Sequence, residues 1–164
     1  MKRLWVILLF VIIGCSTGPT TVIDDFTGTT IHRGIISGES GLIGGLLLLT
    51  AERQITSEMK ETFLIRIGFH HTDWLFIESI TFKNNNNNWE KSYKWESWDV
   101  STDVFGGGRI TEDVVIILSK EEFTELLSQS DFRARLYGKS NYKTFPFPPN
   151  KTTTWKEFLN TKID

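Results

Sequence analysis

Apolar side chains recur at every second position of residues 62–71, and this alternation constrains the fold more than any other feature of the chain. Phe63, Ile65, Ile67 and Phe69 are the alternating residues, so in an extended segment they share one face. A period of two is typical of a β-strand with one side buried. The pattern therefore predicts a sheet that packs one face against a core.

Further strands are predicted along most of the chain. Residues 74–82 form a second alternating segment, whose change of phase suggests a bulge. Its short connection to the first strand predicts that the two pair in an antiparallel hairpin. Residues 84–88 are five asparagines, which favour a hairpin tip, and the glycines at 106–108 favour a turn. The remaining predicted strands cover residues 46–49, 93–100, 113–118, 132–137 and 142–147.

Two short helices are predicted towards the C-terminus. Ser119 with Glu122, and Thr154 with Glu157, have the spacing of a capping box at a helix start. Apolar residues at helical spacing follow each box and predict the buried stripes: Phe123, Leu126 and Leu127 in the first helix, and Trp155, Phe158 and Leu159 in the second. The expected fold is therefore mainly β (α+β), an antiparallel β-sheet or sandwich with two short helices near the C-terminus.

The N-terminus has the layout of a secretory signal. Lys2 and Arg3 precede ten apolar residues, a stretch shorter than the ~20 needed to cross a bilayer. The sequence Ile12-Ile13-Gly14-Cys15 resembles the lipobox of bacterial lipoproteins. The resemblance implies a signal peptide at 1–14 and acyl chains on Cys15. An ordinary cleaved signal, or an apolar first strand of a cytosolic protein, is the alternative interpretation.

Cysteine usage and charge fit an anchored envelope protein. Cys15 is the only cysteine, so no disulfide forms within one chain. Residues 15–22 are expected to be a short linker, followed by a single β-rich domain at 23–164. Of 18 basic and 20 acidic residues, the signal removes two basic ones, which leaves a net charge of −4. This balance argues against a nucleic-acid partner.

The sequence contains no clear catalytic or metal-binding constellation. His70 and His71 are adjacent, so on a strand they point to opposite faces. Gly38-Glu39-Ser40-Gly41 resembles a nucleophile elbow, but leucine replaces the glycine needed at position 42. We predict no metal and no cofactor. An enzyme whose site combines scattered residues, such as His70, Asp73 and Arg133, stays open as an alternative.

An aromatic cluster is the most distinctive candidate for a binding surface. Trp89, Tyr93 and Trp95 have the same parity and would share one face of a continuous strand, with Trp98 on the other. Exposed aromatic rings stack on sugars or anchor protein interfaces. Buried ones build a core. The sequence leaves both interpretations open.

Several segments from about residue 63 onwards resemble small bacterial lipoproteins of unknown function. They are Asp73-Trp74-Leu75-Phe76-Ile77, residues 112–119 with the following Glu121-Glu122, residues 132–138, and the closing aromatic-rich helix. The resemblance implies one envelope domain and carries no activity or ligand.

The expected function is a membrane-anchored, non-enzymatic binding or scaffolding domain of the cell envelope with a protein partner. A glycan- or envelope-polymer-binding module is the first alternative. Serine at position 16 favours the outer membrane in a Gram-negative cell, by resemblance to lipoprotein sorting there, with the domain periplasmic or surface-exposed. The sequence leaves the oligomeric state open.

Overall fold

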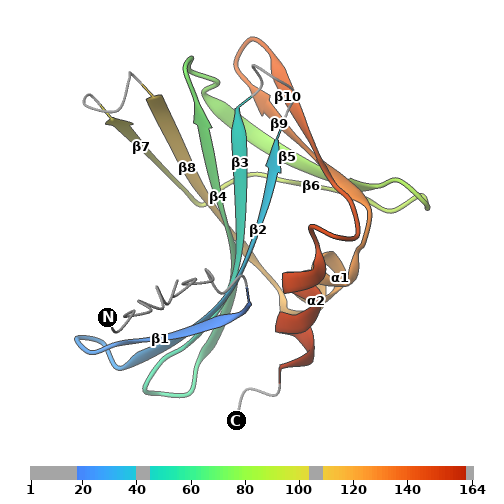
Figure 1. Cartoon of the computed structure of the whole chain (residues 1–164). Helices are drawn as coiled ribbons and strands as arrows, with labels where there is room; N and C mark the ends of the chain where they lie inside the picture. Colours follow the sequence, from blue (N-terminus) through green and yellow to red (C-terminus); the bar gives the residue numbers. More distant parts are fainter. Residues whose placement is uncertain (1–17, 40–44, 104–108, 162–164) are drawn as a thin grey trace, which may run out of the picture.

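The computed structural model describes residues 18–39, 45–103 and 109–161, and in these segments the protein is mainly β (Figure 1). Two antiparallel sheets face each other, and two short helices pack beside them. The predicted fold class is therefore confirmed. The signal segment, Cys15, the Ser40–Gly41 pair and the 106–108 turn all lie outside the described residues.

Sheet A has six strands. In spatial order they are β1 (Thr20–Asp24), β2 (Thr29–Glu39), β3 (Leu46–Ile55), β4 (Glu61–His71), β8 (Arg109–Leu118) and β7 (Ser97–Asp103). The alternation that predicted β4 is confirmed, because Ile65, Ile67 and Phe69 are fully buried on its inner face. β1 begins at Thr20, so three residues of the expected linker belong to a strand.

Sheet B has four strands, in the spatial order β10 (Tyr142–Phe147), β9 (Phe132–Gly138), β5 (Ile77–Asn84) and β6 (Glu90–Tyr93). The predicted bulge is present between Ile77 and Ser79, and the asparagine run joins β5 to β6 as a hairpin tip. The strand predicted at 132–137 is β9, in which Arg133, Arg135 and Tyr137 point outward and alternate with buried residues.

One prediction of strand pairing and one of strand extent were wrong. β4 pairs with β3 and β8, whereas β5 pairs with β9 and β6, so the short connection between β4 and β5 joins the two sheets instead of closing a hairpin. The predicted strand at 93–100 is also divided. β6 ends at Tyr93 in sheet B, and β7 begins at Ser97 in sheet A. The chain crosses between sheets there, and the Glu96 N–H donates to the Val115 carbonyl (2.8 Å).

The core fills the space between the inner faces of the two sheets. Phe69 of sheet A meets Phe145 of sheet B edge-on, with ring centres 5.8 Å apart. The ring of Phe132 stacks on Phe147 (5.1 Å) and on Trp155 (5.8 Å). Such buried rings contribute much of the apolar area that stabilises a domain of this size.

The helices lie against one end of this core (Figure 1). α1 (Lys120–Ser128) begins with the predicted capping box: Ser119 Oγ accepts the Glu122 N–H (3.2 Å), and Glu122 accepts the Ser119 N–H (3.1 Å). Its predicted stripe is buried. Neither helix of the described residues combines the length and apolar character needed to cross a bilayer.

The second capping box was predicted wrongly. α2 (Thr153–Asn160) already includes Thr154 in its first turn, and its N-cap Thr152 makes no side-chain capping bond. Thr152 Oγ1 instead donates to the Pro149 carbonyl (3.1 Å), because the preceding proline turn brings that oxygen close. The predicted apolar stripe is nevertheless correct. Trp155 is fully buried and its Nε1 donates to the Gly34 carbonyl of β2 (2.9 Å).

Candidate functional site

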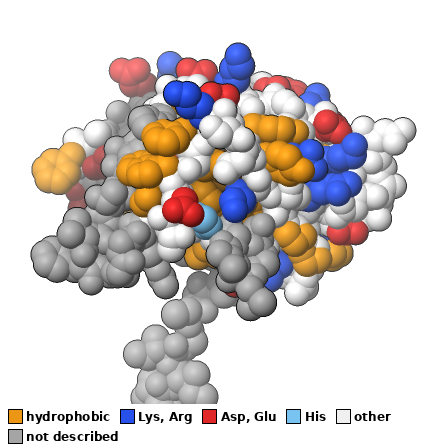
Figure 2. Space-filling view, turned by 90° about the horizontal axis from the view of Figure 1, so that it is seen from above, with side chains coloured by type: hydrophobic (Ala, Val, Ile, Leu, Met, Phe, Trp, Pro, Cys, Tyr) orange, Lys and Arg blue, Asp and Glu red, His pale blue; other side chains and the backbone are white. Residues whose placement is uncertain are grey.

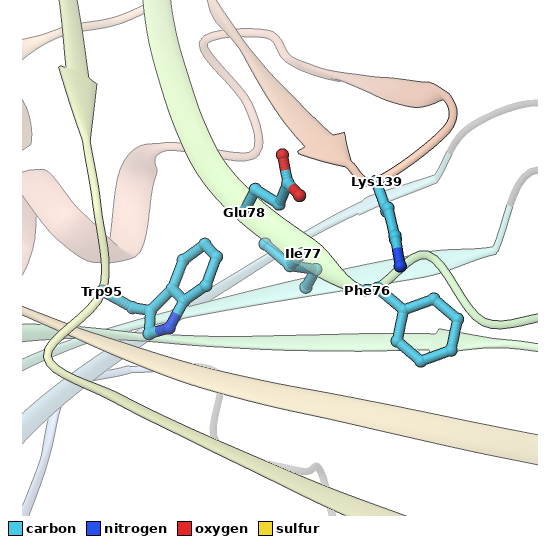
Figure 3. Close-up of a pocket in the computed structure, with 5 residues that line it drawn as sticks. All are labelled: Phe76, Ile77, Glu78, Trp95 and Lys139. Atoms are coloured by element: carbon cyan, nitrogen blue, oxygen red, sulfur yellow. The ribbon is translucent and has the colours of Figure 1, made fainter.

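A cavity of about 280 Å³ lies where sheet B begins and the chain crosses between the sheets (Figure 3). Phe76, Ile77 and Glu78 come from the start of β5, Trp95 from the crossover between β6 and β7, and Lys139 from the β9–β10 turn. The walls are mostly aromatic and aliphatic, and one carboxylate and one ammonium group lie among them. Cavities of this character bind ligands or partner side chains.

A buried carboxylate shapes the wall of this cavity. Glu112 of β8 is fully buried, and its Oε1 accepts the N–H groups of Leu75 (2.5 Å) and Phe76 (3.0 Å), while Oε2 accepts that of Ile77 (2.9 Å). Three converging backbone dipoles compensate the buried negative charge. The connection from β4 to β5 is therefore held rigidly against sheet A.

The fixed connection presents two aromatic rings to solvent. Trp74 and Phe76 stack with ring centres 5.5 Å apart and planes 16° apart, and they are 39% and 47% exposed. Phe76 has a φ of 53°, a left-handed conformation that non-glycine residues adopt at a cost of about 1–3 kcal/mol. Neither burial nor backbone preference accounts for a phenylalanine at this position.

The β9–β10 turn closes the cavity from the other side. Gly138 lies so near the connection that an added Cβ would come within 2.0 Å of the Leu75 carbonyl oxygen. The Lys139 N–H donates to that same oxygen (3.3 Å). Glycine at position 138 is thus required for the close approach that places Lys139 at the cavity.

Figure 2 looks down on the upper end of the molecule as drawn in Figure 1 and shows hydrophobic side chains there at the surface.

The structure separates the predicted aromatic cluster. Trp89 and Tyr93 are half-buried and pack on the core: Trp89 Nε1 donates to Glu125 Oε1 (2.8 Å), and the Tyr93 ring meets Phe82 edge-on. Burial, followed by the nearby Glu122 and Glu125 carboxylates, raises the pKa of Tyr93 to about 12. Trp89 and Tyr93 therefore lie where side chains support the packing of sheet B and α1.

Of the other two residues, Trp95 lines the cavity. Trp98 lies on β7 opposite Val114, in the other sheet, and its side chain is outside the described part. Sequence reasoning missed Trp74 and Phe76 as site residues because it assigned them to a strand. The Glu112 bonds that define this site join residues 35–37 positions apart, and no local pattern reports them.

A second, smaller cavity of about 170 Å³ lies on the outer face of sheet B. Thr81, Lys83, Glu90, Arg133, Arg135 and Tyr137 line it. Lys83 pairs with Glu90 (2.8 Å), and the Arg135 guanidinium lies 4.8 Å from the centre of the Tyr142 ring. In Figure 2 basic side chains gather on the right, the side on which Figure 1 places sheet B. This face can attract an anion.

The other candidate residues take structural positions. His70 shares a hydrogen bond with Thr111 Oγ1 (2.9 Å) in sheet A, whereas Arg133 lies on sheet B, so the structure does not combine them in one site. Within residues 18–39, 45–103 and 109–161, no three histidine, cysteine or acidic side chains group as metal ligands do. Glu52 is buried between Arg33 (3.0 Å) and Arg66 (2.9 Å), which neutralise it on the outer face of sheet A.

Comparisons of the chain with models of protein families, with curated proteins and with solved structures give no significant match.

Proposed function

We propose that the protein is a lipid-anchored binding module of the bacterial cell envelope, which receives a protein partner at the cavity formed by Phe76 and Trp95. The observation that carries the proposal is the rigid display of Trp74 and Phe76 beside this cavity. Tryptophan and other large aromatic residues dominate the energetic centres of protein interfaces. Rigid aromatic groups also lose little conformational entropy on binding.

The cavity can receive one large side chain of a protein partner. Its volume of about 280 Å³ lies at the lower end of the range of about 300–1,000 Å³ that is typical of ligand sites. One large apolar side chain of a partner would fill it, and the stacked pair would cover the partner's surface next to it. Lys139 and Glu78 line the cavity as well, and each can form an ion pair with an oppositely charged group of the partner and so fix its orientation.

Cross-linking in cells tests this proposal. The wild-type lipidated chain is treated with a membrane-permeant cross-linker, purified, and its co-purifying envelope proteins are quantified by mass spectrometry. In a double variant, Trp74→Ala with Phe76→Asn, the amount of the main co-purifying partner should fall about tenfold or more. The reason is that a few residues at the centre of an interface contribute most of its binding energy. The matched control is Ile35→Ala with Ile117→Ala, which removes two residues of similar exposure (51% and 54%) from the outer face of sheet A. Equal loss in both variants, or in neither, would reject the site.

The tether is a separate part of the proposal, and it depends on Cys15. Cys15→Ala should abolish incorporation of labelled palmitate and leave the signal uncleaved. Several acyl chains, each contributing about 0.8 kcal/mol per buried CH₂, would otherwise hold the domain at a membrane. Membrane attachment by a correctly cleaved Cys15→Ala chain would contradict the tether.

The basic cavity supports binding of an acidic envelope glycan as a second candidate function. Arg133 is exposed on β9 and lines this cavity beside Arg135 and Glu90. Its planar guanidinium can bind a carboxylate or phosphate through two parallel hydrogen bonds. Trigalacturonate should then bind in calorimetry where neutral maltotriose does not. Arg133→Gln should weaken that binding about tenfold, whereas removing the remote exposed charge of Lys156 should leave it unchanged.

A further inference from the structure

Two turns at one end of sheet A expose large hydrophobic side chains. Phe26, in the turn between β1 and β2, is fully exposed (101%), and Met59, in the turn between β3 and β4, is 79% exposed. The turns are neighbours, because a Cβ added at Gly28 would lie 3.8 Å from the Cβ of Ser57. They form the lower left of the molecule in Figure 1.

Hydrogen bonds hold the Phe26 turn in place. Asp24 Oδ1 accepts the Phe26 N–H (3.0 Å), Asp24 Oδ2 accepts the Thr27 hydroxyl (2.8 Å), and the Gly28 N–H donates to the Asp24 carbonyl (2.8 Å). The Thr27 hydroxyl and then the Phe26 N–H lower the pKa of Asp24, so the carboxylate keeps these bonds at neutral pH. The ring is thus displayed by an ordered turn at a position where a polar residue would serve the fold equally well.

Met59 lies in a conformation that its side chain disfavours. Its φ is 60°, a region where glycine or asparagine is the usual residue. Its N–H donates to the Thr56 carbonyl (2.9 Å), and the Lys60 N–H donates to Thr56 Oγ1 (3.2 Å), so this turn is ordered too. Because this side chain is 79% exposed, burial in the core does not account for a methionine at this position.

Both turns lie within reach of the proposed lipid. β1 begins only five residues after Cys15, a length of chain that spans at most about 18 Å. Val22 and Ile23 lie between that point and Phe26 and are 44% and 62% exposed. As neighbours on a strand these two side chains point to opposite faces of β1, the edge strand of sheet A that leads from the anchored end to the Phe26 turn.

We infer that these two turns contact the surface of the bilayer that carries the Cys15 lipid, with Phe26 and Met59 reaching the boundary between headgroups and acyl chains. Burial of apolar side chains at this boundary is favourable. Asp25 precedes Phe26, and Glu58 and Lys60 lie on either side of Met59, so neither turn carries a basic cluster that would require anionic lipid. The inference rests on the lipid tether proposed above.

The contact would also orient the domain. The register of β3 with β4 joins Ile55 to Glu61 at the end that carries Met59, and Leu46 to His70 at the end that leads to Trp74. The ten residues of β3 separate these ends by about 30 Å. Bilayer contact at the Met59 end therefore turns the Trp74–Phe76 pair away from the membrane, where an envelope partner can reach it.

The experiment uses the full lipidated chain in phosphatidylcholine vesicles. Once Cys15 carries its lipid, a cysteine introduced by Phe26→Cys or Met59→Cys is the only free thiol and can be labelled with an environment-sensitive fluorophore. Both native side chains are exposed, so neither change removes a core contact. The control is Tyr142→Cys, at an exposed position (58%) on the edge strand of sheet B.

The expected result is blue-shifted emission at positions 26 and 59 on vesicle binding, with at least about twofold quenching by nitroxide-labelled lipid, and no change at position 142. If the chains float with the vesicles but the emission at positions 26 and 59 matches that at position 142, the inference is overturned. The proposed lipid tether is then still supported. Chains that do not float and react at two thiols overturn the tether, and the inference with it.

Discussion

Replacing Glu112 by glutamine tests how the aromatic connection is held, because it changes one buried group by a single atom. In the native protein both carboxylate oxygens accept backbone N–H groups, two at Oε1 and one at Oε2. Glutamine can place its carbonyl oxygen towards Leu75 and Phe76, but its amide N–H₂ must then face the N–H of Ile77. Two donors oppose each other in a fully buried site.

The expected change in the free energy of unfolding on Glu112→Gln follows from the balance of three terms. A buried donor left without an acceptor costs about 1–3 kcal/mol. The two remaining bonds lose their charge assistance, a further loss of about 1 kcal/mol each. Against this, a neutral amide avoids part of the cost of burying a charge, which offsets the second term. The net expectation is a loss of about 2 kcal/mol, and Glu112→Ala, which leaves all three N–H groups unpaired, should lose more.

Urea unfolding followed by tryptophan fluorescence measures this loss, and hydrogen exchange locates it. A loss of about 2 kcal/mol should lower Tm by about 4–8 °C in a chain of this length. The amides of Leu75, Phe76 and Ile77 should exchange faster than those of β9. Glu58→Gln, at an exposed position, is the matched control and should change stability by less than about 0.5 kcal/mol. A Glu112→Gln protein as stable as the control would refute the assigned hydrogen bonds.

Three further predictions concern single side chains. Phe76→Asn should keep or raise stability by up to about 1 kcal/mol, because asparagine tolerates the left-handed backbone, while partner capture is lost; a thermal melt showing clear destabilisation would contradict this. Ser119→Ala should cost about 0.5–2 kcal/mol by removing the cap of α1, and a Ser130→Ala control should not match that loss in urea unfolding. Because the pKa of Tyr93 is raised to about 12 in the fold, the unfolded chain ionises first as pH rises. Stability should therefore fall between about pH 10 and 12, and Tyr93→Phe should flatten this dependence in melts across that range.

Local signals explain which parts of the fold could be predicted from the sequence. The Ser119–Glu122 box and the stripe that follows it involve residues within one or two helical turns, so sequence spacing determines them. The same holds for the alternation in β4 and β9, since each follows from burial of one face. The asparagine hairpin tip is local in the same sense.

Sheet membership could not be predicted in this way. A short connection such as the one after His71 can close a hairpin or cross between two packed sheets, and alternation is identical in both cases. The choice is made by contacts distant in sequence, above all the Glu112 bonds to residues 75–77. For the same reason Trp95 and Phe76 meet at one cavity although the sequence pattern predicts them on two different strands.

Site-specific photo-cross-linking in cells tests the central proposal, partner binding at the aromatic end, most directly. A photoreactive phenylalanine analogue replaces Phe76, and a control chain carries it at Ile117, which has similar exposure (54% against 47%) on the outer face of sheet A. A discrete cross-linked envelope protein from position 76, absent from position 117 and diminished by Trp95→Ala, is the predicted result. No adduct at position 76 in abundant, folded, membrane-bound protein would contradict the proposal.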